Sequence, residues 1–469
     1  MVQFMLQATG LSDVKRDLLS RYMRGVASSK VGTIRRRPAG SAAPLSMSQA
    51  ELYHRELRLH GIPPLHNECV NLRMLGHLDI VALEKSFNET IKRHELWRTT
   101  VETHGGQPVQ IIHPAMPVEL TPVDLQGVPE AGREEVCSRL VSADVCRPFD
   151  VRGGALIRPK LIRMNETEHR LFLTAHQMVL DGVSAYQIFP SELATFYKGF
   201  SSGKSVSLPE PKVQYADFAY WQNESLNGTA TSQISYWRQQ LASETPIASF
   251  PLKAQPIRGT FYGTIKKFSF PKTLSEGIKE FARQMGTTVF LVLLTGVATL
   301  LRQHTNQEEI VVGTLSPSGR KRSEVMGLLG YFLNPVILKF TIKKGTTFRE
   351  LLSQAQGVLL DAMCHDDVPI ERVARELGHA DESSPSPFFS TVVSLQPPTP
   401  NLELPWSVTT MDVENGGSPW ETYFSFIEKP EGFIGRVQYN SDLFDEAAIE
   451  CALHDLQNLL QVHCLEAVV

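Results

Sequence analysis

Apolar residues along this chain recur with helical spacing in some segments and in short extended runs in others. In residues 79–96 (DIVALEKSFNETIKRHEL) they return every three or four positions, which predicts an amphipathic helix. Residues 107–112 (QPVQII) and 171–175 (LFLTA) are predicted strands. The second has no polar alternation, so we expect it to be fully buried. The apolar run at 290–301 (FLVLLTGVATLL) is too short to span a membrane and favours a buried helix.

A similar order of elements returns in the second half. We predict a strand over 264–270, helices over 274–285 and 288–303, and strands over 310–313 and 388–395. There is no short repeat. The repeated order is compatible with a duplicated architecture without establishing it.

Breaks in composition separate these segments. Residues 11–25 (LSDVKRDLLSRYMRG) are a candidate amphipathic helix, and the Ser-, Gly-, Ala- and Pro-rich stretch after it reads as a linker. Residues 201–214 (SSGKSVSLPEPKVQ) read as a connection between two lobes. Residues 378–387 are loop-like, and 396–419 are again rich in Pro and Gly.

Composition narrows the class of protein. With 469 residues, 42% hydrophobic residues, 20% charged residues and a net charge of -4, the chain is typical of a soluble globular protein. This balance gives no reason to expect binding to nucleic acid or to an anionic membrane. The six cysteines form no Cys-x-x-Cys pair, which argues against zinc and leaves no metal predicted. The N-terminus lacks the apolar core of a signal peptide, so we expect a cytoplasmic protein.

A polar cluster follows the buried strand at 171–175. Residues 176–182 (HQMVLDG) place His176, Gln177 and Asp181 where helical spacing resumes after Gly182. Side chains at such a strand–loop–helix junction often border a crevice. A single histidine there is more often a buried structural residue than a catalyst, so this segment alone does not establish a site.

The cluster resembles the His-His-x-x-x-Asp-Gly signature of nonribosomal-peptide condensation domains. His176, Asp181 and Gly182 match it, whereas Gln177 stands where that family has its second, catalytic histidine. Further segments resemble other motifs of the family and occur in the family's order: 45–53 (LSMSQAELY), 93–99 (RHELWRT), 147–150 (RPFD), 215–222 (YADFAYWQ), 312–320 (VGTLSPSGR, with one extra residue), 330–334 (GYFLN), 365–371 (HDDVPIE) and 439–445 (YNSDLFD). The resemblance runs from about residue 11 to the end.

The resemblance implies an α/β (α+β) fold with two chloramphenicol-acetyltransferase-like lobes, arranged as a V-shaped pseudo-dimer around a central tunnel. Residues 1–44 would be an N-terminal helix and linker, 45–210 the lobe with the site motif, and 211–469 the lobe with a floor loop and a latch-like segment. It also implies substrates carried on the phosphopantetheine of donor and acceptor carrier proteins, with no cofactor in the domain itself. An adjacent adenylation domain or a recruited oxygenase are further implied partners, and we expect a monomer.

The resemblance also assigns roles to residues at the site. Asp181 would pair with Arg320 to hold the site loop, with Asn334 as a further structural residue. Gly182 would allow close backbone approach, and its amide would face a developing oxyanion. His176 corresponds to the first histidine of the signature, which points away from the tunnel and supports the site.

The glutamine leaves the chemistry open. A carboxamide takes no proton at pH 7 but both donates and accepts hydrogen bonds, so Gln177 can still position an unprotonated amine. One interpretation is therefore a condensation domain of nonribosomal peptide or hybrid polyketide-peptide biosynthesis that forms amides without the usual base. A second is a catalytically inactive relative that serves as an interaction platform for a tailoring oxygenase or a carrier protein. A third is an engineered glutamine in an otherwise active enzyme.

Other acidic and imidazole side chains receive structural interpretations. His94, His365 and His463 lie in helix-like or loop segments and are expected to serve the fold or surface. Glu421 and Glu428 fall where related epimerisation domains supply an acid. The local match is loose, and epimerisation would also need the missing histidine.

Overall fold

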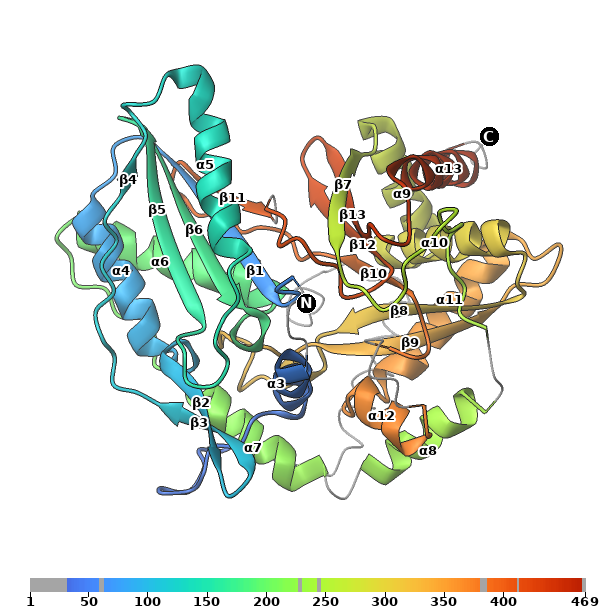
Figure 1. Ribbon diagram of the computed structural model, residues 1–469, viewed down its shortest axis with the longest axis horizontal. Helices are drawn as coiled ribbons and strands as arrows, with labels where there is room; N and C mark the ends of the chain where they lie inside the picture. The colour runs from blue at the N-terminus through green and yellow to red at the C-terminus, as the bar shows by residue number, and fades with distance from the viewer. Residues whose placement is uncertain are drawn as a thin grey trace.

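The computed structural model describes residues 32–465 except 59–62, 227–229, 243–245, 380–385 and 411–412. Figure 1 shows two lobes side by side, each built on one sheet with helices against it. The candidate helix at 11–25 lies outside the described residues.

The first lobe has a five-stranded sheet in the order β11-β1-β6-β5-β4. Helices α4 and α6 pack on one face of it and α5 on the other, because the apolar side chains of β1 and β6 alternate between two separate core clusters. The bounds are β1 (Asn67–Leu75), β4 (Val123–Asp124), β5 (Ile157–Asn165), β6 (Glu168–His176), β11 (Trp406–Thr410), α4 (Ile80–Arg93), α5 (Glu130–Val145) and α6 (Phe189–Ser201).

Local sequence explains these elements. The helix predicted at 79–96 is confirmed as α4, whose N-cap Asp79 accepts a hydrogen bond from the amide of Ala82 at 3.0 Å. The predicted strand at 171–175 is confirmed within β6, where all five residues are buried. The predicted strand at 107–112 is β3 (Gln107–Ile112), which forms a separate two-stranded sheet with β2 (Thr99–His104).

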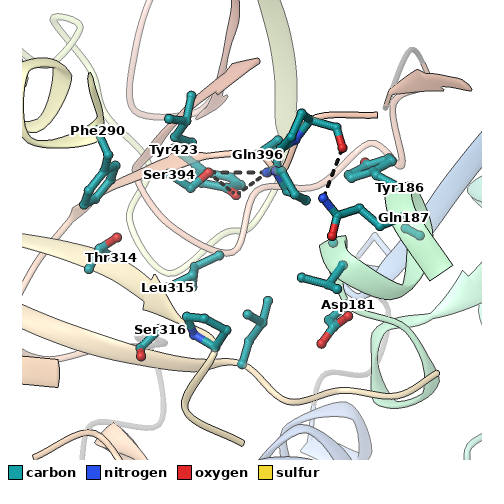
Figure 2. A pocket seen from close by; sticks show the side chains of 18 of the residues that line it. Asp181, Tyr186, Gln187, Phe290, Thr314, Leu315, Ser316, Ser394, Gln396 and Tyr423 are labelled. Atoms are coloured by element: carbon teal, nitrogen blue, oxygen red, sulfur yellow. Dashed lines mark hydrogen bonds between the residues drawn. The ribbon is translucent and has the colours of Figure 1, made fainter. Parts of the chain in front are cut away.

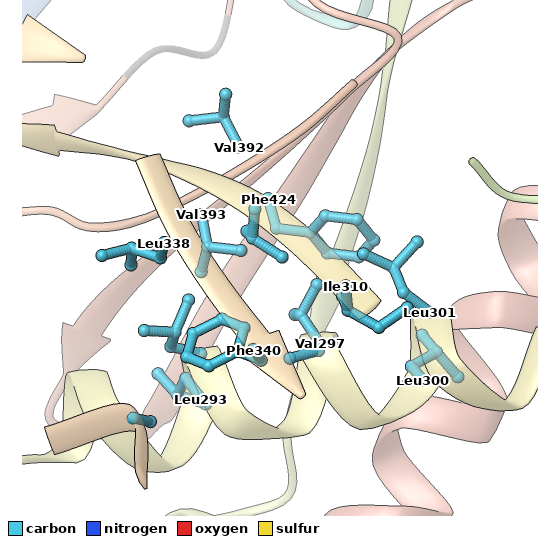
Figure 3. Close-up of a cluster of buried hydrophobic side chains, with 14 of the residues drawn as sticks. Leu293, Val297, Leu300, Leu301, Ile310, Leu338, Phe340, Val392, Val393 and Phe424 are labelled. Carbon is cyan, nitrogen blue, oxygen red and sulfur yellow. The ribbon is translucent and has the colours of Figure 1, made fainter. Parts of the chain in front are cut away.

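The second lobe has a six-stranded sheet in the order β7-β13-β12-β10-β8-β9. Apolar side chains of α10 pack against strands of this sheet, as Leu293, Val297, Ile310 and Phe340 show in Figure 3. The bounds are β7 (Gly263–Ser269), β8 (Glu309–Ser316), β9 (Asn334–Thr341), β10 (Thr391–Leu395), β12 (Thr422–Lys429), β13 (Gly432–Asn440), α9 (Lys272–Gln284), α10 (Val289–Thr305), α11 (Phe348–Met363) and α13 (Glu446–Cys464). The helices and strands predicted for this half are confirmed, although β10 begins three residues later than expected.

A segment from late in the chain completes the sheet of the first lobe. Strand β11 comes from the Pro- and Gly-rich stretch at 396–419, in which we predicted no strand, and it pairs antiparallel with β1 of the first lobe. Helix α7 (Tyr215–Leu226) packs into the first core and α8 (Ala230–Gln240) into the second. The chain therefore changes core between these helices, later than the predicted connection at 201–214.

Two short helices lie where the lobes meet. Helix α3 (Met47–Arg58) belongs to the first lobe and α12 (Ile370–Glu376) to the second. Arg55 of α3 pairs with Glu371 at 2.7 Å, and Arg375 of α12 pairs with Glu51 at 2.9 Å, so two ion pairs join these helices.

Within the described part of the chain, no single helix is long and apolar enough to cross a membrane. Helices α9 and α10 are long and apolar enough only when they are taken together, and the chain bends by 106° between them.

Candidate functional site

A cavity of about 1340 Å³ lies between the lobes. Its wall includes Gln177, Asp181 and Gly182 from the predicted site loop, and strands β8, β10, β12 and β13 of the second lobe provide the opposite side. Figure 2 shows Asp181 and Tyr186 on one side and Thr314, Ser316 and Ser394 on the other. A cavity lined from both lobes is where a ligand would meet the site loop.

The site loop follows β6 directly. The ladder between β1 and β6 ends with the pair Asn67 and His176, and the amide of Gln177 then donates to His66 O at 2.7 Å. A single 3-10 turn, Gln177–Val179, breaks the strand, and a π-helical turn, Ser184–Ile188, leads into α6. The predicted strand–loop–helix junction is confirmed.

His176 and Gln177 have different environments. His176 is completely buried, and its Nδ1 accepts a hydrogen bond from the amide of Met178 at 3.2 Å, so its hydrogen is on Nε2. That Nε2 lies 3.8 Å from Oε2 of Glu56, on the side away from the cavity lining. His176 is thus positioned as a supporting residue and does not reach a substrate in the cavity.

Glu56 lies between two imidazoles. His66 donates to Glu56 Oε2 through Nδ1 at 2.7 Å, and His176 Nε2 lies 3.8 Å from the same oxygen. Burial raises the pKa of Glu56, but the two imidazoles outweigh it and hold that pKa well below its usual range. Burial also lowers the pKa of His66, which keeps this imidazole neutral at pH 7.

Glu56, His66 and His176 offer ligand atoms within 4.8 Å of one another, and two imidazoles with a carboxylate would suit zinc. Binding through His176 Nε2 would require a proton on Nδ1, which already accepts the Met178 amide hydrogen. The observed hydrogen bonds therefore fit a carboxylate that orients two histidines better than they fit a metal centre.

Asp181 holds the site loop in place at the wall of the cavity. Its two carboxylate oxygens accept hydrogen bonds from Arg320 Nε at 2.9 Å and Nη2 at 2.8 Å, and Oδ1 also accepts the amide of Ser184 at 2.7 Å. Arg320 further donates to Leu328 O at 3.0 Å and stacks on the ring of Phe332. Both side chains are buried, so this ion pair holds the site loop against the segment that carries Arg320.

Gln177 and Gly182 border the cavity itself. The carboxamide of Gln177 is partly exposed there, and no residue in the described ranges hydrogen-bonds to it. At Gly182, a Cβ would lie 2.9 Å from Oε1 of Gln396, so any larger residue would require the Gln396 side chain to move.

Gln396 belongs to the second lobe and follows β10. Its Nε2 donates to Ser425 Oγ at 3.0 Å and lies 3.4 Å from both Ser394 Oγ and Tyr423 Oη. Figure 2 shows this side chain reaching into the cavity between Tyr423 and the site loop. The second lobe thus brings a carboxamide to the glycine of the site motif.

The charged side chains that line the cavity include Glu68 from β1 and Arg436 from β13. Burial raises the pKa of Glu68, and the positive charge of Arg436 offsets part of this effect. Because Glu68 pairs in register with Ala175, its side chain emerges on the face of the sheet that Ala175 occupies, close to the start of the site loop.

The other residues singled out in the sequence lie outside the cavity lining. Asn334 donates to the carbonyls of Asp366 and Val368 at 2.7 and 2.8 Å, so it ties β9 to the 365–371 segment. His365 stacks on Tyr236 and His463 on Phe348, while buried His94 contacts Glu192 at 2.8 Å. The Ser249 hydroxyl donates a hydrogen bond to the Glu421 carboxylate, and Glu428 forms an ion pair with Lys279.

Sequence reasoning missed Gln396, Glu56, His66 and Glu68. None belongs to a residue pattern with a known spacing, and each meets its partners only through folding. Gln396 directly follows the strand predicted at 388–395, whereas Glu56, His66 and Glu68 lie in α3 and around the start of β1, for which the sequence analysis predicted no element.

Comparison with known proteins agrees with this geometry. The structure is similar to the X-domain from teicoplanin biosynthesis (TM-score 0.79, 22% identity, 92% of this chain and 97% of that one). It is equally similar to the first condensation domain of the CDA synthetase (TM-score 0.79, 18% identity, 91% and 97%). These likenesses support the two-lobed, chloramphenicol-acetyltransferase-like α/β fold that the sequence predicted.

The family follows from sequence. The condensation domain model matches residues 41–465, and the chain belongs to this family. A linear gramicidin synthase protein of Brevibacillus parabrevis is 34% identical over 435 residues, which cover 90% of this chain and 6% of that protein. Phosphinothricin tripeptide synthetase PhsC of Streptomyces viridochromogenes is 28% identical over 448 residues, or 94% of this chain and 41% of that protein. The predicted condensation domain of nonribosomal peptide biosynthesis is therefore confirmed, and it corresponds to a small part of the first of these synthetases.

Proposed function

We propose that this domain joins a carrier-bound acyl or peptidyl thioester to the amine of an acceptor, with Gln177 positioning the amine. One observation carries the proposal: the Gln177 carboxamide stands where the family's catalytic histidine is expected, borders the interlobe cavity, and has no hydrogen-bond partner among the described residues.

The reaction requires no base in the protein. The amine nitrogen attacks the thioester carbonyl, the C–N bond forms, the C–S bond breaks, and the proton lost by nitrogen goes to the departing sulfur. Gln177 accepts an N–H hydrogen bond but takes no proton, so the amine must arrive neutral. An α-amino group with a pKa of about 7.7–8.0 is partly neutral at physiological pH, which makes this route accessible.

Backbone geometry favours acyl transfer at the same place. Gly182 lies at the start of the helix that follows the site loop and borders the cavity. Amides of a first helical turn lack intrahelical partners, and such amides stabilise a developing oxyanion. Asp181 and Arg320 hold this backbone in place.

The substrates and partners belong to the same proposal. The domain carries no cofactor of its own; donor and acceptor arrive on the phosphopantetheine of carrier proteins and meet in the interlobe cavity. An adjacent adenylation domain would select the acceptor that one carrier protein brings.

A second function is favoured by one comparison. The X-domain from teicoplanin biosynthesis has been solved in complex with OxyB, and that X-domain resembles this chain with a TM-score of 0.76 and 23% identity. A catalytically inactive platform that recruits an oxygenase or a carrier protein is therefore the alternative to amide formation.

Product formation separates these functions. Donor and acceptor loaded on carrier proteins are incubated with wild type, Gln177→His and Gln177→Ala, and the amide is measured by mass spectrometry. We expect turnover by wild type, a strong loss in Gln177→Ala, and a gain of up to about 10²–10⁴-fold in Gln177→His, because an imidazole adds general base catalysis.

Each other outcome has a definite meaning. If wild type and Gln177→His both make no product, the amide-forming function is wrong and the platform is favoured. If only Gln177→His makes product, the glutamine has inactivated a competent site. If Gln177→Ala equals wild type, the positioning role is wrong. The platform function is tested by a pull-down with the cognate oxygenases and carrier proteins. It is rejected if this domain captures none of them.

A further inference from the structure

We propose that Gln396 is a second carboxamide that positions the acceptor amine, opposite Gln177. This inference rests on the proposed function, because it names the group that the second lobe contributes to the same site.

The backbone of Gln396 is held rigidly. The residue follows β10 directly, and its amide donates to Phe426 O at 2.8 Å, which extends the contact between β10 and β12 by one residue. Pro397 and Pro398 come next, and their rings restrict the backbone on the other side. The backbone from which the Gln396 side chain extends is therefore fixed on the wall of the cavity.

The nitrogen end of the side chain is anchored by hydroxyl groups. Nε2 of Gln396 donates to Ser425 Oγ at 3.0 Å. Ser394 Oγ and Tyr423 Oη, which hydrogen-bond to each other at 2.8 Å, both lie 3.4 Å from the same nitrogen. These contacts come from β10 and β12 and orient the carboxamide, so Oε1 faces the first lobe.

The oxygen end has no hydrogen-bond donor in the described part of the chain. Oε1 lies 2.9 Å from the position that a Cβ would take at Gly182, on the side of the first lobe. Gln396 is partly exposed and lines the cavity, so this oxygen is free to accept a hydrogen bond from a ligand beside Gly182.

The chemistry of Oε1 selects an amine over a thioester. A carbonyl oxygen only accepts hydrogen bonds, so it offers nothing to the carbonyl of the donor. A neutral primary amine has two N–H groups and one lone pair. If one N–H binds Gln177 and the other binds Gln396, the lone pair stays free. The two contacts then orient the nitrogen toward the thioester carbonyl, and such orientation accelerates the attack.

Amine recognition can be measured without turnover. The probes are an aminoacyl pantetheine in which an amide replaces the thioester, and its des-amino form, titrated at pH 8.5 by calorimetry. We expect wild type to bind the amino probe about 5- to 150-fold more tightly than the des-amino probe, the range of two neutral hydrogen bonds.

Three variants test the residue. Gln396→Met keeps the length of the side chain but removes the oxygen, and should lower this affinity ratio to about 2- to 12-fold, the contribution of the remaining contact with Gln177. Gln396→Glu keeps an oxygen at the same reach and should retain the preference. Gln284→Met is the matched control, because Gln284 lies exposed on α9, is not one of the residues that line the cavity, and donates to Glu280. Thermal unfolding midpoints confirm that the variants are folded.

The result would overturn the inference if wild type does not prefer the amino probe, or if Gln396→Met keeps the full preference. A wild type that prefers the amino probe but forms no amide would overturn the proposed function and leave amine recognition by Gln396 supported. The two proposals therefore fail separately.

Discussion

Arg320 and Asp181 form a two-pronged, buried ion pair, with Arg320 Nε and Nη2 2.9 and 2.8 Å from the two oxygens of the Asp181 carboxylate. The pair joins the loop after β8 of the second sheet to the loop after β6 of the first. Because both side chains are removed from solvent, each depends on the other to remain buried.

Replacing one member of this pair should destabilise the protein strongly. We expect Asp181→Asn to lower the free energy of unfolding by about 3–5 kcal/mol, because it leaves the Arg320 charge buried without its partner. The double variant Asp181→Asn, Arg320→Met should lose less than the sum of the single variants. Urea denaturation measures both. Glu403→Gln, which breaks an exposed pair with Lys198, is the control and should leave stability almost unchanged.

Gly182→Ala should reduce activity while leaving the protein folded. The added Cβ would lie 2.9 Å from Gln396 Oε1, and this flexible side chain moves more easily than backbone. A displacement of about 1 Å at a reacting centre costs up to about 100-fold in rate. Rates of amide formation check this. The double variant Gly182→Ala, Gln396→Ala should form amide no more slowly than Gln396→Ala alone, because the side chain that would meet the added Cβ is gone. A fully active Gly182→Ala would contradict the close approach.

Asp366 should make stability depend on pH. Burial raises the pKa of this carboxyl to about 6, with Lys321 acting in the opposite direction. Because the folded pKa lies above the ordinary value of 3.8, the neutral form favours folding. The contribution is complete below pH 3.8 and is lost as the pH rises through 6, by about 3 kcal/mol in total.

Asp366→Asn removes this titration. The variant should therefore lose less stability than wild type between pH 4 and 7, as measured by urea midpoints across that range. Parallel curves for the two proteins would show that Asp366 keeps an ordinary pKa.

Glu56→Gln should have the opposite pH signature. The pKa of Glu56 is held below its usual range by His66 and His176, so its contribution is present above the ordinary value and is lost as the pH falls. We expect the variant to be about 1–3 kcal/mol less stable at pH 7. The difference should shrink in acid, as thermal unfolding would show. Glu89→Gln, in an exposed pair with Lys92, is the control, and an equal loss there would reject the assignment.

Much of the fold is visible in local sequence. The three- and four-residue spacing of α4 and the buried run of β6 predicted their elements directly, because each pattern reflects burial against a single core. Strand β11 was missed because its apolar residues, Trp406 and Val408, stand in a Pro- and Gly-rich stretch, and its partner β1 lies more than 300 residues earlier.

The candidate site was only partly predictable. The position of Gln177 followed from a resemblance over the whole chain, and the pairing of Asp181 with Arg320 from the same source. The environment of Gln396 depends on hydroxyls from β10 and β12, and Glu56 reaches His176 across 120 residues of sequence. Such contacts form only after distant segments have packed together, so the spacing of residues along the sequence does not predict them.

Strand β11 has a practical consequence for anyone who divides or recombines such domains. It carries residues from late in the chain to the free side of β1, so a fragment that ends before it would leave that side unpaired over Val70 to Met74. An open strand edge of this kind invites association with other chains. A hybrid with its junction between the lobes would pair β1 of one parent with β11 of the other, so exchanging the two lobes together keeps this strand pair matched.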